Sequence, residues 1–196
     1  MRSNMMLLMA AAIWGLGFVA QRLGMDHMGP FTFNGLRFLL GALSLLPLLW
    51  WLKSRQPRPQ PGSPSGDRRL LLAGGLIAGG VLFSAASLQQ VGLLYTTAAK
   101  AGFITGLYII LVPVIGLALR HKTGANTWVG ALIAMAGLYY LSVTEEFTIG
   151  YGDLLQVIGA LFWAVHLLVL DHYSNRVAPI RLAVVQFVVC GLLSLA

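Results

Sequence analysis

The chain has 196 residues, of which 58% are hydrophobic and only 10% are charged, and its mean hydropathy is +0.80. This composition excludes an ordinary soluble domain and indicates a protein of the lipid bilayer. The net charge of +7 does not indicate nucleic acid binding, because the basic residues lie between apolar segments and do not gather on one solvated face.

Seven apolar segments each have about the 17 to 25 residues that a helix needs to cross the hydrocarbon core. The first could pass for a signal peptide, but no convincing A-x-A cleavage site follows it, so we predict a retained helix. Residues 53–69, between the second and third segments, are rich in Pro, Gly, Ser and charge, and this predicts a flexible linker. The predicted helices are Met5–Leu23, Phe31–Leu52, Leu70–Val91, Thr97–Leu119, Asn126–Val143, Asp153–Leu170 and Ile180–Ala196.

The basic residues of the connections predict the orientation. Ten of the thirteen Lys and Arg residues precede the first helix or follow the second, fourth and sixth helices, and these positions all lie on one side of the membrane. The opposite side carries Asp26, Glu145 and Glu146. By the positive-inside rule, the N-terminus is predicted to be cytoplasmic.

A faint copy of the first two helices returns 149 residues later without gaps. Five helices separate the two copies, so the sixth helix must cross in the direction opposite to the first, and the repeats are predicted to be inverted. Inverted repeats are an architecture of secondary transporters, whose substrate site forms near the midplane between the two halves. The alternative is two unrelated apolar helices that each begin with Trp. The aligned pairs of rarer residues are Trp14 with Trp163, Pro30 with Pro179 and Phe38 with Phe187.

The repeat sets the expected domain organisation. We expect residues 1–149 to form a first five-helix repeat and residues 150–196 to begin a second, inverted one. A complete second copy would need about three further helices, so we expect a ten-helix protein of which this sequence is a truncated form.

Five stretches of the chain form an ordered set: IWGLGFVAQRL, GPFTFNGLRFLLGAL, LQQVGLLYTTAAKAGFITGLYIILVPVIGLALR, WVGALIAMAGLYYL and GDLLQVIGALFWAVHLLVLDHY. This set resembles the EamA-type transporters of the drug/metabolite transporter superfamily, and the resemblance covers nearly the whole chain. It implies an all-α inner-membrane carrier of two inverted five-helix halves that moves metabolites such as amino acids, nucleotide sugars or sugar phosphates. The chain departs from the pattern by lacking the last three helices, and by having Arg120 and His121 where many relatives have a Glu.

Three basic residues fall outside the cytoplasmic connections, namely Arg22, Arg37 and Lys100. Arg37 lies about 9 Å below the outer end of its helix at 1.5 Å per residue, and a charge at that depth is a functional candidate by default. Asn34 shares its helix face. The alternatives are a structural Arg37 bonded to carbonyls or to Asp153, and snorkelling of Arg22 and Lys100 to the headgroups. Since no Asp or Glu lies in the middle of a predicted span, these cations favour a carboxylate or phosphate on the substrate.

Aromatic and amide side chains share helix faces in both copies: Trp14 with Gln21 on the first helix, and Trp163 with His166 on the sixth. The two Trp residues could stack on a flat or apolar substrate, or serve in core packing. His166 could relay protons, or be neutral and bonded to a neighbour.

Pro113 removes a backbone hydrogen bond from the fourth helix and should kink or loosen it. This predicts either a gate hinge, with Tyr108 exposed to the cavity, or a static kink. Two GxxxG pairs, Gly75 with Gly79 and Gly102 with Gly106, predict close helix packing.

The sequence therefore predicts a secondary transporter that moves a small metabolite, such as an amino acid, a drug-like compound or a phosphorylated anion, across the bacterial inner membrane by alternating access. We expect a small-molecule substrate and the lipid bilayer as partners, and neither nucleic acid nor a cofactor. The second interpretation is an intramembrane enzyme, which would need a nucleophile with a base, paired carboxylates or a group of metal ligands. A non-transporting helical membrane subunit is the third interpretation.

Overall fold

The structure is a computed structural model, and it describes residues 2–55, 68–119, 124–142 and 150–196. All regular structure in these ranges is helical. Most of the predicted linker falls outside the described residues. The helices are α1 (Arg2–Gly24), α2 (Pro30–Arg55), α3 (Arg68–Gly92), α4 (Ala98–Gly106), α5 (Tyr108–Ala118), α6 (Ala125–Ser142), α7 (Tyr151–Ser174) and α8 (Pro179–Leu195).

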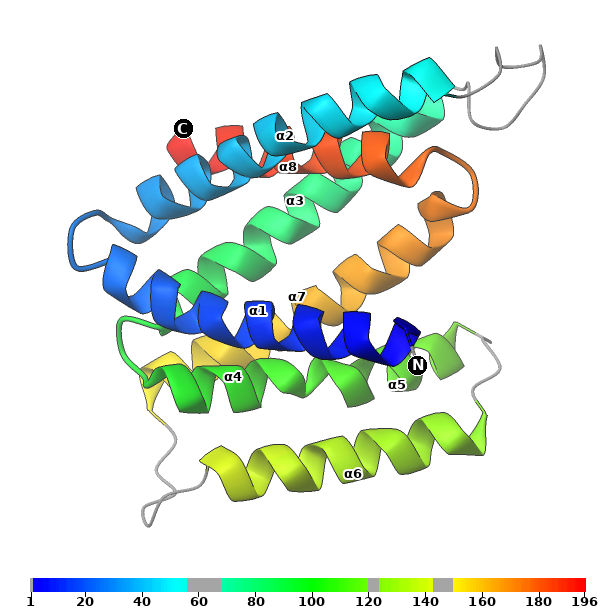
Figure 1. Cartoon of the computed structure of the whole chain (residues 1–196). Helices are drawn as coiled ribbons and strands as arrows, with labels where there is room; N and C mark the ends of the chain where they lie inside the picture. Colours follow the sequence, from blue (N-terminus) through cyan, green and yellow to red (C-terminus); the bar gives the residue numbers. More distant parts are fainter. Residues whose placement is uncertain (1, 56–67, 120–123, 143–149) are drawn as a thin grey trace.

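The seven predicted helices are all present in the described ranges, because α4 and α5 are separated only by Leu107 and form one span. Five spans are long and apolar enough to cross a membrane: α1, α2, α3, the α4–α5 unit and α7. Two further apolar helices are shorter, at Ala125–Gly137 and Pro179–Leu195. Successive spans run in opposite directions, so the ends of α2, α5 and α7 lie on the same side as the N-terminus (Figure 1). The chain is therefore a polytopic membrane protein.

Helix α3 lies at the centre of the bundle, where it packs against α7 and α8, while α2 packs on α8 (Figure 1). Small residues permit this approach. A Cβ atom at Gly75 would lie 2.3 Å from Val185, and one at Gly79 would lie 2.6 Å from Val189. The predicted close packing at this GxxxG pair is confirmed. It is wrong for Gly102, where an added Cβ would meet nothing within 4 Å.

Helix α1 packs chiefly on α4, and most of its apolar side chains remain exposed. Leu8 and Ile13 are 67% and 68% exposed. In a bilayer such side chains face lipid or further helices, since hydrocarbon solvates them as well as a protein interior does. Phe18 is a buried apolar contact of this helix, in a cluster with Leu93 and Ala101.

Candidate functional site

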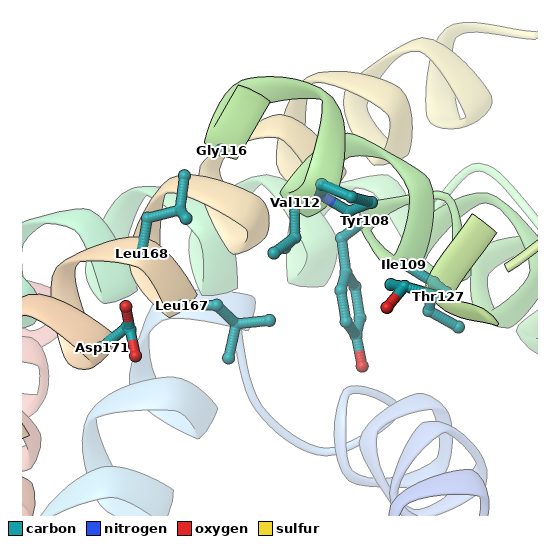
Figure 2. A pocket seen from close by; sticks show the side chains of 9 residues that line it. Tyr108, Ile109, Val112, Gly116, Thr127, Leu167, Leu168 and Asp171 are labelled. Carbon is teal, nitrogen blue, oxygen red and sulfur yellow. The ribbon is translucent and has the colours of Figure 1, made fainter. Parts of the chain in front are cut away.

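A cavity of about 420 Å³ opens between α5, α6 and α7 (Figure 2). Along α5 it extends from Gly116, near the predicted cytoplasmic end, to Tyr108, a distance of about 12 Å at 1.5 Å per residue. The volume lies in the range of small-molecule sites, about 300 to 1,000 Å³. The lining residues are Tyr108, Ile109, Val112, Pro113, Gly116, Thr127, Leu167, Leu168 and Asp171.

At the end of this cavity that lies away from the predicted cytoplasmic side, Tyr108 forms an aromatic pair. The ring of Tyr108 lies 5.8 Å from the ring of Trp14 on α1, and Trp14 in turn contacts Phe18. Trp14 is twelve residues from the start of α1, or about 18 Å along the helix axis, which corresponds to the middle of the bilayer. The structure therefore brings two of the predicted site residues together, each near the middle of its own span.

The α4–α5 span is interrupted beside Tyr108. The Leu107 N–H donates to the Ile104 carbonyl at 3.1 Å, a tighter turn than the α-helical bond to the fourth residue back. Pro113 lies six residues further on, lines the cavity, and has no N–H to donate to the Ile109 carbonyl. The predicted discontinuity of this helix is present, but it lies at Leu107 and not at the proline.

A buried hydrogen-bond network joins α1, α3 and α7. The Gln89 amide N–H donates to Gln21 Oε1 at 3.1 Å, and the Trp163 indole N–H donates to Gln89 Oε1 at 2.8 Å. Gln21 also donates to the Gly17 carbonyl at 3.0 Å. Gln89 therefore uses both ends of its amide and links two predicted site residues, Gln21 on α1 and Trp163 on α7.

Two further buried amides continue this polar region. Gln156 on α7 donates to the Gln89 backbone carbonyl at 2.9 Å and accepts from the Thr105 hydroxyl at 3.3 Å. His166 Nε2 lies 2.8 Å from Gln186 Oε1 on α8, and its ring contacts Trp163. His166 is thus bonded to a neighbour, as one of its two predicted roles requires.

Arg37 and Asn34 lie together on α2, away from this network. Arg37 Nη2 donates to Asn34 Oδ1 at 2.9 Å, and the guanidinium carbon lies 4.6 Å from the centre of the Phe38 ring. The Arg37 Nε and Asn34 Nδ2 atoms are buried without a hydrogen-bond partner. Asp153, the alternative partner considered for Arg37, is engaged elsewhere.

Lys100 makes an ion pair with Asp153, with Nζ 3.5 Å from Oδ2. The same carboxylate accepts from the Thr96 hydroxyl at 2.5 Å and from the Gly150 N–H at 3.0 Å. This cluster fastens the start of α4 to the start of α7. Arg22 is exposed and donates to the Leu93 carbonyl.

The three cations therefore have separate partners on separate elements of the described structure. Arg37 bonds within α2, Lys100 bonds α7, and Arg22 bonds the turn after α3. Their expected role in binding an anion stays a prediction.

A second cavity, of about 490 Å³, lies between α4 and α6. Its walls are apolar or aromatic and include Phe103, Met135 and Tyr139. No described residue of its lining is charged, and its polar side-chain groups are tyrosine hydroxyls.

Sequence reasoning missed several polar residues of the buried hydrogen-bond network and of the cavity between α5, α6 and α7. The available signal was the Gln89–Gln90 pair, because adjacent amides are unusual in an apolar span. Asp171 was missed because it follows the predicted end of its helix. The missed residues are Gln89, Thr105, Asp171 and Gln186.

Comparison with known proteins agrees with these observations. The model of the EamA-like transporter family matches residues 1–143, which is most of the chain. The chain belongs to the EamA-like transporter family. This confirms the resemblance to EamA-type transporters inferred from the sequence. No solved structure matches the chain.

Relatives of this EamA-like protein include three proteins that are described as transporters. An uncharacterized transporter of Archaeoglobus fulgidus is 34% identical over 180 residues, which cover 90% of this chain and 51% of that protein. YetK of Bacillus subtilis, also named an uncharacterized transporter, is 30% identical over 68% of this chain and 39% of its own length. YedA of Escherichia coli K12, named an uncharacterized inner membrane transporter, is 27% identical over 78% of this chain and 47% of its own length. The chain therefore spans about half the length of the curated relatives it matches.

Proposed function

We propose that this EamA-like protein acts in secondary transport, moving a small metabolite across the inner membrane by alternating access. The observation that carries this proposal is the cavity that runs from the predicted cytoplasmic end of α5 to the Trp14–Tyr108 pair. A path that reaches the midplane from one side and ends on an aromatic contact is what an inward-open carrier needs. The name of YedA supports the inner membrane as the location.

The functional carrier is proposed to contain two inverted halves, residues 1–149 forming the first and residues 150–196 opening the second. Two observations support this. The chain spans only about half the length of the matched relatives, and α2 packs directly on α8, its counterpart in the predicted second copy. In inverted repeats, movement of one half against the other alternates the access.

Particular side chains are assigned to the substrate path. Trp14 and Tyr108 are proposed to contact a flat or apolar part of the substrate at the inner end of the cavity. Pro113, which the sequence predicts as a hinge, is proposed to act in the gate together with the interruption at Leu107. Gln21, Trp163 and His166 are proposed to border the midplane site, and Asn34, Arg37 and Lys100 are the candidates for an anionic group of the substrate.

The test is transport by the complete gene product in vesicles, with a panel of amino acids, amphipathic amines and phosphorylated metabolites. Tyr108→Ala should lower the flux of the transported compound, while Tyr140→Ala, at an 85% exposed position on α6, should not. Arg37→Gln should lower flux only if the compound is an anion. Absence of flux for every class, from protein that is folded and inserted, would overturn the proposal.

A further inference from the structure

Among the described residues that line the cavity between α5, α6 and α7, Asp171 is the one that carries a formal charge. The hydroxyl groups of Thr127 and Tyr108 add two uncharged polar groups, and the remaining walls are aliphatic, Pro or Gly. Figure 2 shows Asp171 and Leu167 on the wall formed by α7, and Tyr108 and Val112 on the wall formed by α5. Such a lining complements a molecule with one positive end and an apolar body.

The Asp171 carboxylate is not neutralised within the described ranges. The ion pair found there joins Lys100 to Asp153, and no Lys, Arg or His nitrogen of those ranges lies within 4.0 Å of Asp171. The polar side chains that follow Asp171 bond its backbone instead: the Ser174 hydroxyl and the Asn175 amide both donate to the Asp171 carbonyl, at 3.4 and 3.3 Å. The carboxylate itself is exposed and has no cationic partner among the described residues.

We propose that this cavity binds an amphipathic primary amine, whose ammonium group pairs with Asp171 and whose apolar body lies along Leu167 and Val112 toward Tyr108. As a statement about the transported substrate, this rests on the transport function proposed above. As a statement about binding, the proposal rests on the cavity and does not require transport. It also assigns to the substrate the opposite charge from the one expected from Arg22, Arg37 and Lys100, which bond Leu93, Asn34 and Asp153 outside this cavity.

The same lining disfavours an amino acid relative to the amine that shares its side chain. A zwitterion would bring its own carboxylate into a cavity that already holds Asp171, and the described residues of its lining include no cation. Like charges within a few ångströms repel, and because Asp171 is exposed, water and salt screen part of this repulsion. The site should therefore distinguish phenethylamine from phenylalanine by charge, although the two share the same aromatic body.

The test is equilibrium dialysis of radiolabelled phenethylamine against the purified chain in lipid nanodiscs. Unlabelled competitors are 2-phenylethanol, phenylalanine and 3-phenylpropionate, which keep the aromatic body and change the charge. An ammonium–carboxylate pair at a partly solvated site contributes up to about 1 kcal/mol, so phenethylamine should bind up to about fivefold more tightly than 2-phenylethanol. Phenylalanine and 3-phenylpropionate should compete more weakly still.

The variants assign this preference to one side chain. Asp171→Asn should reduce phenethylamine affinity to that of 2-phenylethanol, and Asp171→Glu should restore the preference for the amine. Asp26→Asn, an exposed carboxylate in the turn after α1, is the matched control and should change nothing. Equal affinity for amine and alcohol, or an unchanged preference in Asp171→Asn, would overturn the inference.

Binding and transport are measured separately, so the two proposals can fail independently. Amine binding that depends on Asp171 supports the site even if the complete protein moves no compound, a result that would count against transport. Flux of other compounds by the complete protein, without Asp171-dependent amine binding, would overturn the amine site alone.

Discussion

Phe38 on α2 and Phe187 on α8 contact each other, with ring centroids 5.6 Å apart. The predicted repeat aligns these two positions, which are 149 residues apart. A residue can meet its own equivalent only close to a symmetry axis, so this contact lies where a pseudo-two-fold axis between inverted halves would pass. The neighbours agree: a Cβ atom at Gly41 would lie 3.4 Å from Phe187, and Cys190, the equivalent of Gly41, shares a buried cluster with Phe38.

This contact predicts a coupling between two mutations. Phe38→Ala and Phe187→Ala should each lower the free energy of unfolding, and together they should cost less than the sum of the single changes. The coupling expected of an aromatic pair is about 0.5 to 1.5 kcal/mol. Unfolding in mixed micelles titrated with denaturing detergent measures all four proteins of the cycle. Trp50→Ala, at a 75% exposed position, is the control and should show no coupling with Phe38→Ala.

The contact between α3 and α8 gives a second prediction. A methyl group at Gly79 would lie 2.6 Å from Val189 Cβ and 3.0 Å from the Gln186 carbonyl oxygen, so Gly79→Ala must push the helices apart. Overpacking of this kind costs about 1 to 3 kcal/mol. At the neighbouring Gly80 an added Cβ meets nothing within 4 Å, so Gly80→Ala should be neutral or stabilising. Similar unfolding curves for the two variants would contradict the packing described here.

The adjacent amide side chains of Gln89 and Gln90 on α3 give a third prediction, in which the same substitution has opposite effects on stability at the two positions. Gln89→Leu removes the acceptor of the Trp163 indole and the donor to Gln21, and hydrogen bonds of this kind in membrane proteins contribute about 1 kcal/mol each. Gln90 is fully buried and both of its amide atoms lack a partner, so Gln90→Leu should leave the chain at least as stable. Thermal unfolding followed by Trp fluorescence compares the two. Greater destabilisation by Gln90→Leu than by Gln89→Leu would contradict the network.

The ion pair between Lys100 and Asp153 predicts a salt-dependent coupling. Lys100 is 31% exposed, so the pair should contribute no more than about 1 kcal/mol, and less at high salt. A double-mutant cycle with Lys100→Met and Asp153→Asn separates the pair from the bonds that Asp153 also accepts from Thr96 and Gly150. A coupling energy that does not change with salt would argue against an electrostatic contact.

The sequence predicted the helices well because apolar length is a local property. All seven expected helices are present in the described ranges, and their ends differ by a few residues. Side-chain partners were harder, because they depend on how helices rotate against one another. Lys100 bonds Asp153, 53 residues away in the sequence, and Gln89 bonds Trp163, 74 residues away. At such separations the helix period of one segment does not predict which face of another segment it meets.

The candidate site was predicted only in part for the same reason. Trp14 and Tyr108 were both expected at the cavity, but their mutual contact required the relative placement of α1 and α5. Arg37 was predicted as a site residue because of its depth in the membrane. Its side chain donates a hydrogen bond to Asn34, one turn away on the same helix. Asp171 reads as an ordinary helix-end carboxylate until α5 and α6 form the other walls of its cavity.

Pro113 gives the last prediction, because the interruption at Leu107 lies where the cavity meets Tyr108. Pro113→Ala supplies an N–H that can bond the Ile109 carbonyl, so α5 should become more regular and the turn at Leu107 should open less often. Backbone amide exchange at residues 108–111 should slow, and the complete carrier should transport more slowly while its substrate affinity changes little.

Pro47, inside α2 and away from the cavity, supplies the control for this prediction. Pro47→Ala restores a hydrogen bond of the same kind, but it should leave both amide exchange at residues 108–111 and the transport rate unchanged. A hinge requires the turn to open during transport, whereas a static bend does not. Slower exchange with an unchanged rate would assign the interruption to a static bend, and slower exchange with slower transport would assign it to the gate.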